Sequence, residues 1–182
     1  MKKTTHERIL WIVRTGVLLA LLVTLQYITK PAGQLLTGSC VNAVLAVAAL
    51  FGGLSCGIVI ALLSPVLAYL LNIAPQILTV PAIMVGNTVY VLLLALLYKE
   101  STVGKLFAWL AAAAAKAAVL YGIVAGLICG VFAPALLGAG MLKEPMLKAL
   151  PATFSWMQLF TALIGGALAM LIVPPLKKAL KK

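Results

Sequence analysis

The stretch AAAAAKAAVLYGIVAGLICG, residues 111–130, is an apolar run that contains a single lysine, Lys116. A transmembrane helix needs about 20 mostly apolar residues, so this stretch is long enough to cross a bilayer. If the helix begins near Val103, a rise of about 1.5 Å per residue places Lys116 about 20 Å into a hydrocarbon core of about 30 Å. A lysine at that depth costs about 2.5–3.5 kcal/mol and indicates a functional site with a partner for the charge. The alternative is that the side chain extends to a headgroup region.

The composition is that of an integral membrane protein. Of the 182 residues, 64% are apolar and 9% are charged, and aspartate is absent. We therefore predict one all-α membrane domain over residues 1–182. The net charge of +11 does not indicate nucleic-acid binding, because the basic residues lie at the ends of apolar segments. The three cysteines have no CxxC spacing, and we predict no disulfide, no metal and no cofactor.

The apolar pattern predicts a bundle of six transmembrane helices. Proline, glycine or polar residues separate successive segments. The predicted spans are residues 9–29, 39–51, 54–71, 81–98, 103–131 and 156–173. A re-entrant pair is the alternative for the two short segments, 39–51 and 54–71. The longest connection, residues 132–155, is expected to form a structured cap.

Six spans place both termini on one side of the membrane, and the basic residues indicate which side. The positive-inside rule predicts cytoplasmic termini in a bacterial cell membrane, because most basic residues lie on the side of the termini. On that side are Lys2, Lys3, Arg8, Arg14, Lys99, Lys105, Lys177, Lys178, Lys181 and Lys182. On the other side are Lys30, Lys143 and Lys148.

This orientation brings polar side chains from four helices to one depth. At about 1.5 Å per residue from Pro81, Asn87 lies about 10 Å below the outer surface, which is close to the level inferred for Lys116. Tyr90, three residues after Asn87, lies on the same face of the helix. A cation, amides and aromatic rings at one depth suit a small polar ligand with an anionic group. The predicted substrate-binding residues are Lys116, Asn87, Tyr90, Asn42, Trp156, Gln158, Gln34 and Gln76. Such amides also bond neighbouring helices, and such aromatics also lie at membrane interfaces.

Small residues recur every four positions on three helices, a pattern that lets helix backbones approach closely. For two of these stripes we predict packing inside the bundle: Gly122, Gly126 and Gly130, and Thr161, Gly165 and Ala169. The third, on the first helix, is predicted to be a docking surface for another protein. It consists of Gly16, Ala20 and Thr24.

The motifs of common enzyme classes are absent from the sequence. There is no P-loop, HExxH or GxSxG, and the three acids, Glu7, Glu100 and Glu144, fall outside the predicted spans. The lack of these motifs predicts a protein that is not an enzyme. A proton-coupled carrier usually needs a carboxylate in the membrane, and a secondary transporter usually shows an internal repeat; the sequence shows neither feature.

The chain resembles the substrate-binding S components of energy-coupling factor (ECF) vitamin transporters over nearly its whole length. The similarity lies in the six-span length, the basic ends, the lysine-bearing fifth helix and three stretches. These are TGSCVNAVLAVAALFGGLSCGIVIALLSPVLAYLL from Thr37, VPAIMVGNTVYVLLLALL from Val80 and SWMQLFTALIGGALA from Ser155.

The resemblance implies a bundle that captures a vitamin or similar micronutrient at its outer face. It implies delivery through a membrane T component driven by two cytoplasmic ATPases, with the bundle toppling in the membrane to release its cargo. In that family the first helix offers an AxxxA-type surface to the T component, and the matching positions here read Gly16, Ala20 and Thr24.

Two other functions stay open at this point. One is a self-contained membrane interaction or assembly protein whose small-residue stripes all serve oligomer contacts, and the other is a stand-alone facilitator. Stabilisation by a micronutrient would favour the S component, whereas a stable homo-oligomer without a ligand response would favour the assembly protein. For an S component, the outer connections 30–38 and 132–155 carry Pro and Gly and are expected to act as a lid.

Overall fold

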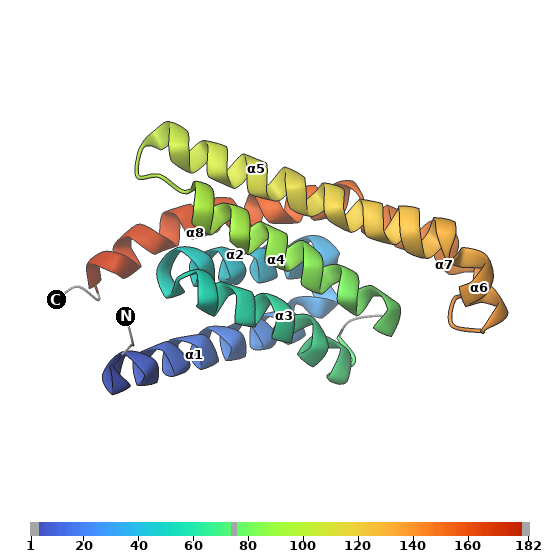
Figure 1. The fold of residues 1–182 in the computed structure, drawn as a ribbon, viewed down its shortest axis with the longest axis horizontal. Helices are drawn as coiled ribbons and strands as arrows, with labels where there is room; N and C mark the ends of the chain where they lie inside the picture. The colour runs from blue at the N-terminus through green and yellow to red at the C-terminus, as the bar shows by residue number, and fades with distance from the viewer. Residues whose placement is uncertain (1–3, 74–75, 180–182) are drawn as a thin grey trace.

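A computed structural model describes residues 4–73 and 76–179 and shows a bundle of helices (Figure 1). The α-helices are α1 Thr5–Thr29, α2 Gln34–Val47, α3 Leu54–Leu70, α4 Val80–Leu97, α5 Thr102–Tyr121, α6 Ala133–Gly138, α7 Glu144–Thr153 and α8 Trp156–Ala179. α2 continues as a π-helical turn, Ala48–Gly52, and α5 as a π-helix, Gly122–Val131. Short 3₁₀ turns lie at Lys30–Ala32 and Ile77–Thr79.

Within the described residues, five helical segments are long and apolar enough to cross a membrane, and α3 is a shorter apolar helix. The five are Thr5–Ala32, Gln34–Gly52, Ile77–Leu97, Thr102–Val131 and Glu144–Ala179. α3 has 17 residues, which at about 1.5 Å each approach the core thickness of about 30 Å. The predicted class, an all-helical membrane protein, is confirmed.

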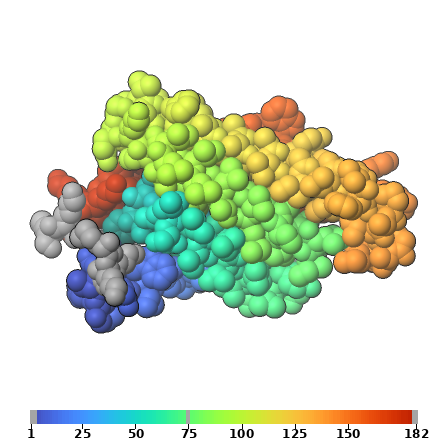
Figure 2. All heavy atoms as spheres, viewed as in Figure 1, coloured from blue at the N-terminus to red at the C-terminus, as the bar shows by residue number. Residues whose placement is uncertain are grey.

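The two ends of the bundle differ. The first turn of α1 and the last turn of α8 lie at one end, here called the terminal end, and α6 and α7 lie at the other, here called the cap end (Figure 1). In Figure 2 the cap, in orange, projects beyond the other helices. Four lysines that enter the positive-inside argument, Lys2, Lys3, Lys181 and Lys182, lie outside the described residues.

Local sequence explains where several helices begin. Thr4 and Glu7 form a capping box at the start of α1: the Glu7 N–H donates to Thr4 Oγ1 at 3.3 Å, and the Thr4 N–H donates to Glu7 Oε2 at 2.8 Å. Ser101 caps α5 by accepting a bond from the Gly104 N–H at 3.1 Å. These caps fix the terminal end of both helices.

The turn between α1 and α2 is shorter than predicted. The expected break over residues 30–38 is wrong, because the structure confines it to Lys30–Gly33 and α2 begins at Gln34. Gly33 has a φ of 92°, which glycine adopts readily, and this conformation lets the chain reverse its direction within the short turn. Thr37 lies inside α2, where its hydroxyl donates to the Gly33 carbonyl at 3.0 Å. Residues 132–155, in contrast, contain α6 and α7 and form the structured cap that was expected.

The close packing of α8 on α2 depends on the stripe of small residues in α8. Thr161, Gly165 and Ala169 are buried, as predicted. A Cβ on Gly165 would lie 2.6 Å from both the Ala43 nitrogen and the Ser39 carbonyl oxygen of α2. Only glycine therefore permits this approach of the two backbones.

The stripe Gly122, Gly126 and Gly130 faces outward, so its predicted packing inside the bundle is wrong. All three glycines are exposed, and a Cβ on Gly122 or Gly126 would meet nothing within 4 Å. The inward face of this segment carries Val124, which is fully buried in an apolar cluster with the cap residue Leu150. Larger side chains fill the interface here, which leaves the glycines on the opposite face.

α1 is the most exposed of the described helices that can cross a membrane. It lies along one edge of the bundle, in contact with α2 and α3 (Figure 1). Its buried residues are Thr15 and Leu22, whereas Gly16, Ala20 and Thr24 are all exposed. The stripe on α1 is therefore available to another molecule.

Candidate ligand-binding site

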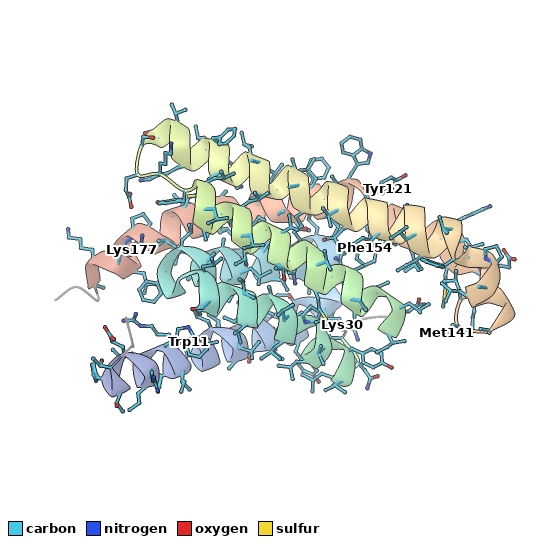
Figure 3. The ribbon with its side chains drawn as sticks, viewed as in Figure 1. Trp11, Lys30, Tyr121, Met141, Phe154 and Lys177 are labelled. Carbon is cyan, nitrogen blue, oxygen red and sulfur yellow. The ribbon has the colours of Figure 1, made fainter. Side chains whose placement is uncertain are left out.

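A cavity of about 150 Å³ lies toward the cap end of the bundle. Residues of α1, α2, α4 and α5 form its walls, and the junction of α7 and α8 contributes Thr153 and Phe154. Figure 3 shows Lys30 and Phe154, two of the lining residues, in the half of the molecule away from Lys177. Helices that are distant in the sequence thus meet around one cavity, which both polar and apolar residues line.

Lys116 is the buried cation of this cavity. Its side chain is 2% exposed, and its Nζ donates to Asn42 Oδ1 at 2.5 Å and to Asn87 Oδ1 at 2.7 Å. The Tyr90 ring centroid lies 5.4 Å from Nζ, which is cation–π distance. The predicted common depth of Lys116 and Asn87 is therefore confirmed. Extension of the lysine to a headgroup region is excluded, because its ammonium is held between α2 and α4.

A second layer of hydrogen bonds holds these partners in place. The Asn42 side-chain amide donates to Thr161 Oγ1 at 3.2 Å, and the Thr161 hydroxyl donates to the Gln158 carbonyl at 3.1 Å. The Tyr90 hydroxyl donates to the Ala162 carbonyl at 3.1 Å. Because α8 accepts from both α2 and α4, the position of Lys116 is fixed by three other helices.

The charge of Lys116 has no acidic partner. Its ammonium carries three protons, and the two amide oxygens accept two of them. None of the three acids lines the cavity: Glu7 caps α1, Glu100 lies 3.4 Å from Lys105, and Glu144 begins α7. An unpaired buried cation is unfavourable, so this arrangement suits a ligand that brings a negative charge.

The side of the cavity near the α1–α2 turn carries polar residues as well. Lys30 lines it and donates from Nζ to the Asn72 carbonyl, and the exposed Gln34 lies at the start of α2. Gln158, which is 7% exposed, donates from Nε2 to the Thr153 carbonyl at 3.5 Å. The α1–α2 turn and the α7–α8 junction therefore border the same space.

The structure brings five of the eight predicted site residues to the cavity wall: Lys116, Asn87, Asn42, Gln158 and Gln34. Tyr90 is fully buried and contacts Lys116 without lining the cavity. The cavity wall also contains residues that were not predicted: Gln26, Lys30, Thr37, Thr153 and Phe154. Gln26 and Thr37 could have been predicted, because each is a polar residue near the outer end of its apolar segment, as Asn42 is.

Two predicted residues lie elsewhere. Trp156 is 73% exposed and lines, with Tyr121, a surface groove of about 400 Å³ between α5 and α8. It lies two residues from Gln158, and residues two apart on a helix do not share a face. Gln76 does not line the cavity, and its Nε2 lies 2.8 Å from Met146 Sδ of the cap. The exposed aromatics Tyr121 (labelled in Figure 3) and Trp156 are typical of a membrane interface.

Comparison with known proteins gives one match. Residues 11–177 match the family model described as ECF transporter, substrate-specific component. No curated protein and no solved structure matches the chain. The matched range begins within α1 and ends within α8, so it includes every helix that contributes to the cavity.

Proposed function

Because the chain belongs to the family of ECF transporter substrate-specific components, we propose that its cavity captures a small micronutrient through an anionic group. The protein is a multi-pass membrane protein and the binding component of a transporter, not an enzyme. The observation that carries the proposal is Lys116, which is buried at the cavity wall without an acidic partner. An anion of the cargo would supply the missing charge.

The direction of capture follows from the lysines. We propose that the cap end faces the outside and the terminal end faces the cytoplasm, since Lys99, Lys105, Lys177 and Lys178 lie at the ends of helices close to the terminal end. Cargo would then enter beside the cap and leave only after a rearrangement of the protein in the membrane.

The partners proposed from the family are a membrane T component and two cytoplasmic ATPases. The surface proposed for the T component is the exposed face of α1 that carries Gly16, Ala20 and Thr24. In lipid there is little hydrophobic drive to helix association, so a smooth face that allows close backbone approach is the appropriate contact. A Cβ on Gly16 would meet nothing within 4 Å, so none of the described helices packs against that position.

The proposal is tested by mass spectrometry of the small molecule that co-purifies with the protein. Wild type and Lys148→Met, which alters an exposed lysine of α7, should both carry an anionic compound of low mass, and Lys116→Met should lose it. Retention of the compound by Lys116→Met, or a compound that is purely cationic, would contradict the proposed site.

A further inference from the structure

Two polar atoms of cavity-lining residues are left without a partner. In the described part of the chain, four buried side-chain oxygen or nitrogen atoms have no hydrogen-bond partner, and they belong to Gln26, Ser64, Gln76 and Asn87. Of these residues, only Gln26 and Asn87 line the cavity. The unpaired atom of Gln26 is the acceptor Oε1, and that of Asn87 is the donor Nδ2.

These unpaired atoms indicate which hydrogen-bonding groups a ligand of the cavity should carry. Buried polar atoms in proteins almost always have a hydrogen-bond partner, and one without a partner is destabilising. Asn87 Nδ2 lies on the same amide whose oxygen accepts from Lys116, so an anion that meets the ammonium can also accept from this group. Gln26 Oε1 is different, because it can be satisfied only by an O–H or N–H group.

The remaining lining narrows the class of ligand. Lys116 and Lys30 are the cations of the lining and no acid is present, so a cationic ligand would find no ion-pair partner. Lys30 is exposed, and Lys116 is the one buried cation among these lining residues, so the buried part of the cavity matches a single negative charge, as on a carboxylate, better than a doubly charged phosphate. Phe154 is the one aromatic residue of the lining, so a flat ring system would have no pair of rings to stack between.

The size of the cavity sets a further limit. Its volume of about 150 Å³ equals that of an engineered protein cavity that holds one benzene molecule, and it is about half the lower bound for drug-sized ligands. The bound part of the ligand is therefore compact.

We infer that the cargo is a compact, non-aromatic carboxylate that also carries a hydroxyl or N–H donor, and that Gln26 of α1 binds this donor while Lys116 and Asn87 bind the carboxylate. This inference rests on the proposed function and deepens it, because it assigns a substrate class and a specificity-determining residue. Gln26 is the only glutamine or asparagine that α1 contributes, so α1 takes part in selecting the cargo.

The test uses matched pairs of acids as probes on the purified full-length protein. The pairs are propionate and 3-hydroxypropionate, butyrate and 4-hydroxybutyrate, and pentanoate and 5-hydroxypentanoate, with affinities measured by titration calorimetry. For at least one chain length the hydroxy acid should bind about tenfold more tightly than its parent acid. Gln26→Leu should reduce this ratio to about one, whatever its effect on the affinity for the parent acid. Tyr27→Leu, which alters the exposed neighbour of Gln26, should preserve the ratio.

The outcomes separate this inference from the proposed function. Equal binding of both members of every pair, lost in Lys116→Met, would overturn the role of Gln26 and leave the anion site intact. The role of Gln26 would also be overturned if Gln26→Leu kept the wild-type ratio of affinities for the hydroxy acid and its parent acid. If the leucine variant does not fold, Gln26→Met is measured in its place. Failure of all the acids to bind would overturn the substrate class, whereas the proposed function is decided by the co-purified compound and by the partner subunits.

Discussion

Lys116 of α5 and Asn87 of α4 are joined by a hydrogen bond of 2.7 Å between Nζ and Oδ1, and both residues are buried inside the helix bundle. This bond holds the ammonium at a cavity without pairing its charge. Asn42 completes the arrangement from α2. The site is thus built from neutral oxygens around one cation, and several measurable properties depend on it.

Removal of the cation should abolish most of the binding free energy that the anion contributes. Lys116→Met keeps the length of the side chain, so the fold should be retained, whereas the affinity for the co-purified compound should fall by about 2 kcal/mol or more because its anion would lie buried without a counter-charge. Titration calorimetry measures the difference. Lys148→Met is the control, and an unchanged affinity in Lys116→Met would remove this lysine from the site.

A carboxylate introduced beside Lys116 should take the place of the cargo anion. Asn87→Asp preserves the shape of the side chain and would put a negative charge within hydrogen-bond distance of Nζ. We expect the melting temperature to stay equal or rise, because the cation gains a partner, and the affinity for the cargo to fall at least about tenfold. Asn72→Asp adds the same charge at an exposed position and should have a smaller effect. Normal binding by Asn87→Asp would show that cargo does not use the charge of Lys116.

Glycines from the two stripes of small residues, in α8 and in the segment after α5, should respond differently to added bulk. Gly165→Val places atoms against the α2 backbone, where a Cβ already comes within 2.6 Å of Ala43 and Ser39, and should destabilise the fold by about 1–3 kcal/mol or more. Gly126→Val points into open space and should leave the melting temperature nearly unchanged. Thermal unfolding in detergent measures both, and equal stability of the two variants would contradict the packing of α8 on α2.

A bulky residue on α1 should prevent docking of the partner subunit and leave cargo binding intact. Ala20→Trp lies on the exposed face, so the isolated protein should bind cargo normally but fail to co-purify with the T component and the ATPases. Leu171→Trp, at a residue of α8 that is 73% exposed, is the matched control and should co-purify. A normal yield of the complex with Ala20→Trp would move the docking face away from this stripe, and loss of cargo binding would place α1 in the binding core.

Cargo should slow the motion of the segments that border the cavity. Phe154 and Thr153 reach the cavity from the cap, and Gly33 and Gln34 reach it from the α1–α2 turn. We expect hydrogen exchange in residues 132–155 and 30–38 to slow when cargo is present, with residues 102–110 of the terminal end unaffected. Identical exchange with and without cargo in both bordering segments would refute a lid role for them.

Depth along a helix could be predicted from the sequence, whereas rotation about its axis could not. A constant rise per residue and one choice of orientation were enough to bring Lys116 and Asn87 to the same level, and their side chains are bonded. The same count placed Trp156 at the correct end of α8, but depth does not say which face a residue occupies. The spacing of two residues between Trp156 and Gln158 means only that both could not face the cavity.

The stripes of small residues likewise did not indicate which helix face packs inside the bundle. Gly165 and Gly126 occur in similar four-residue patterns, yet one meets the α2 backbone and the other meets nothing within 4 Å. The difference lies in the neighbouring helices, since α2 approaches α8 closely while the segment after α5 packs through Val124. Lys30 was missed for a related reason: it lines the cavity only because Gly33 turns α2 back beside α1 within a few residues.

The placement of Gln26 and Ala20 on one helix would link cargo binding to partner docking. A rise of about 1.5 Å per residue separates them by about 9 Å, which is less than two turns, and a helix does not bend appreciably over that distance. Any rotation of α1 that brings Gln26 to the cargo therefore also rotates Ala20 where the partner subunit would grip it. If a partner subunit docks at Ala20 as proposed, its affinity for the bundle would then depend on whether cargo is bound at Gln26.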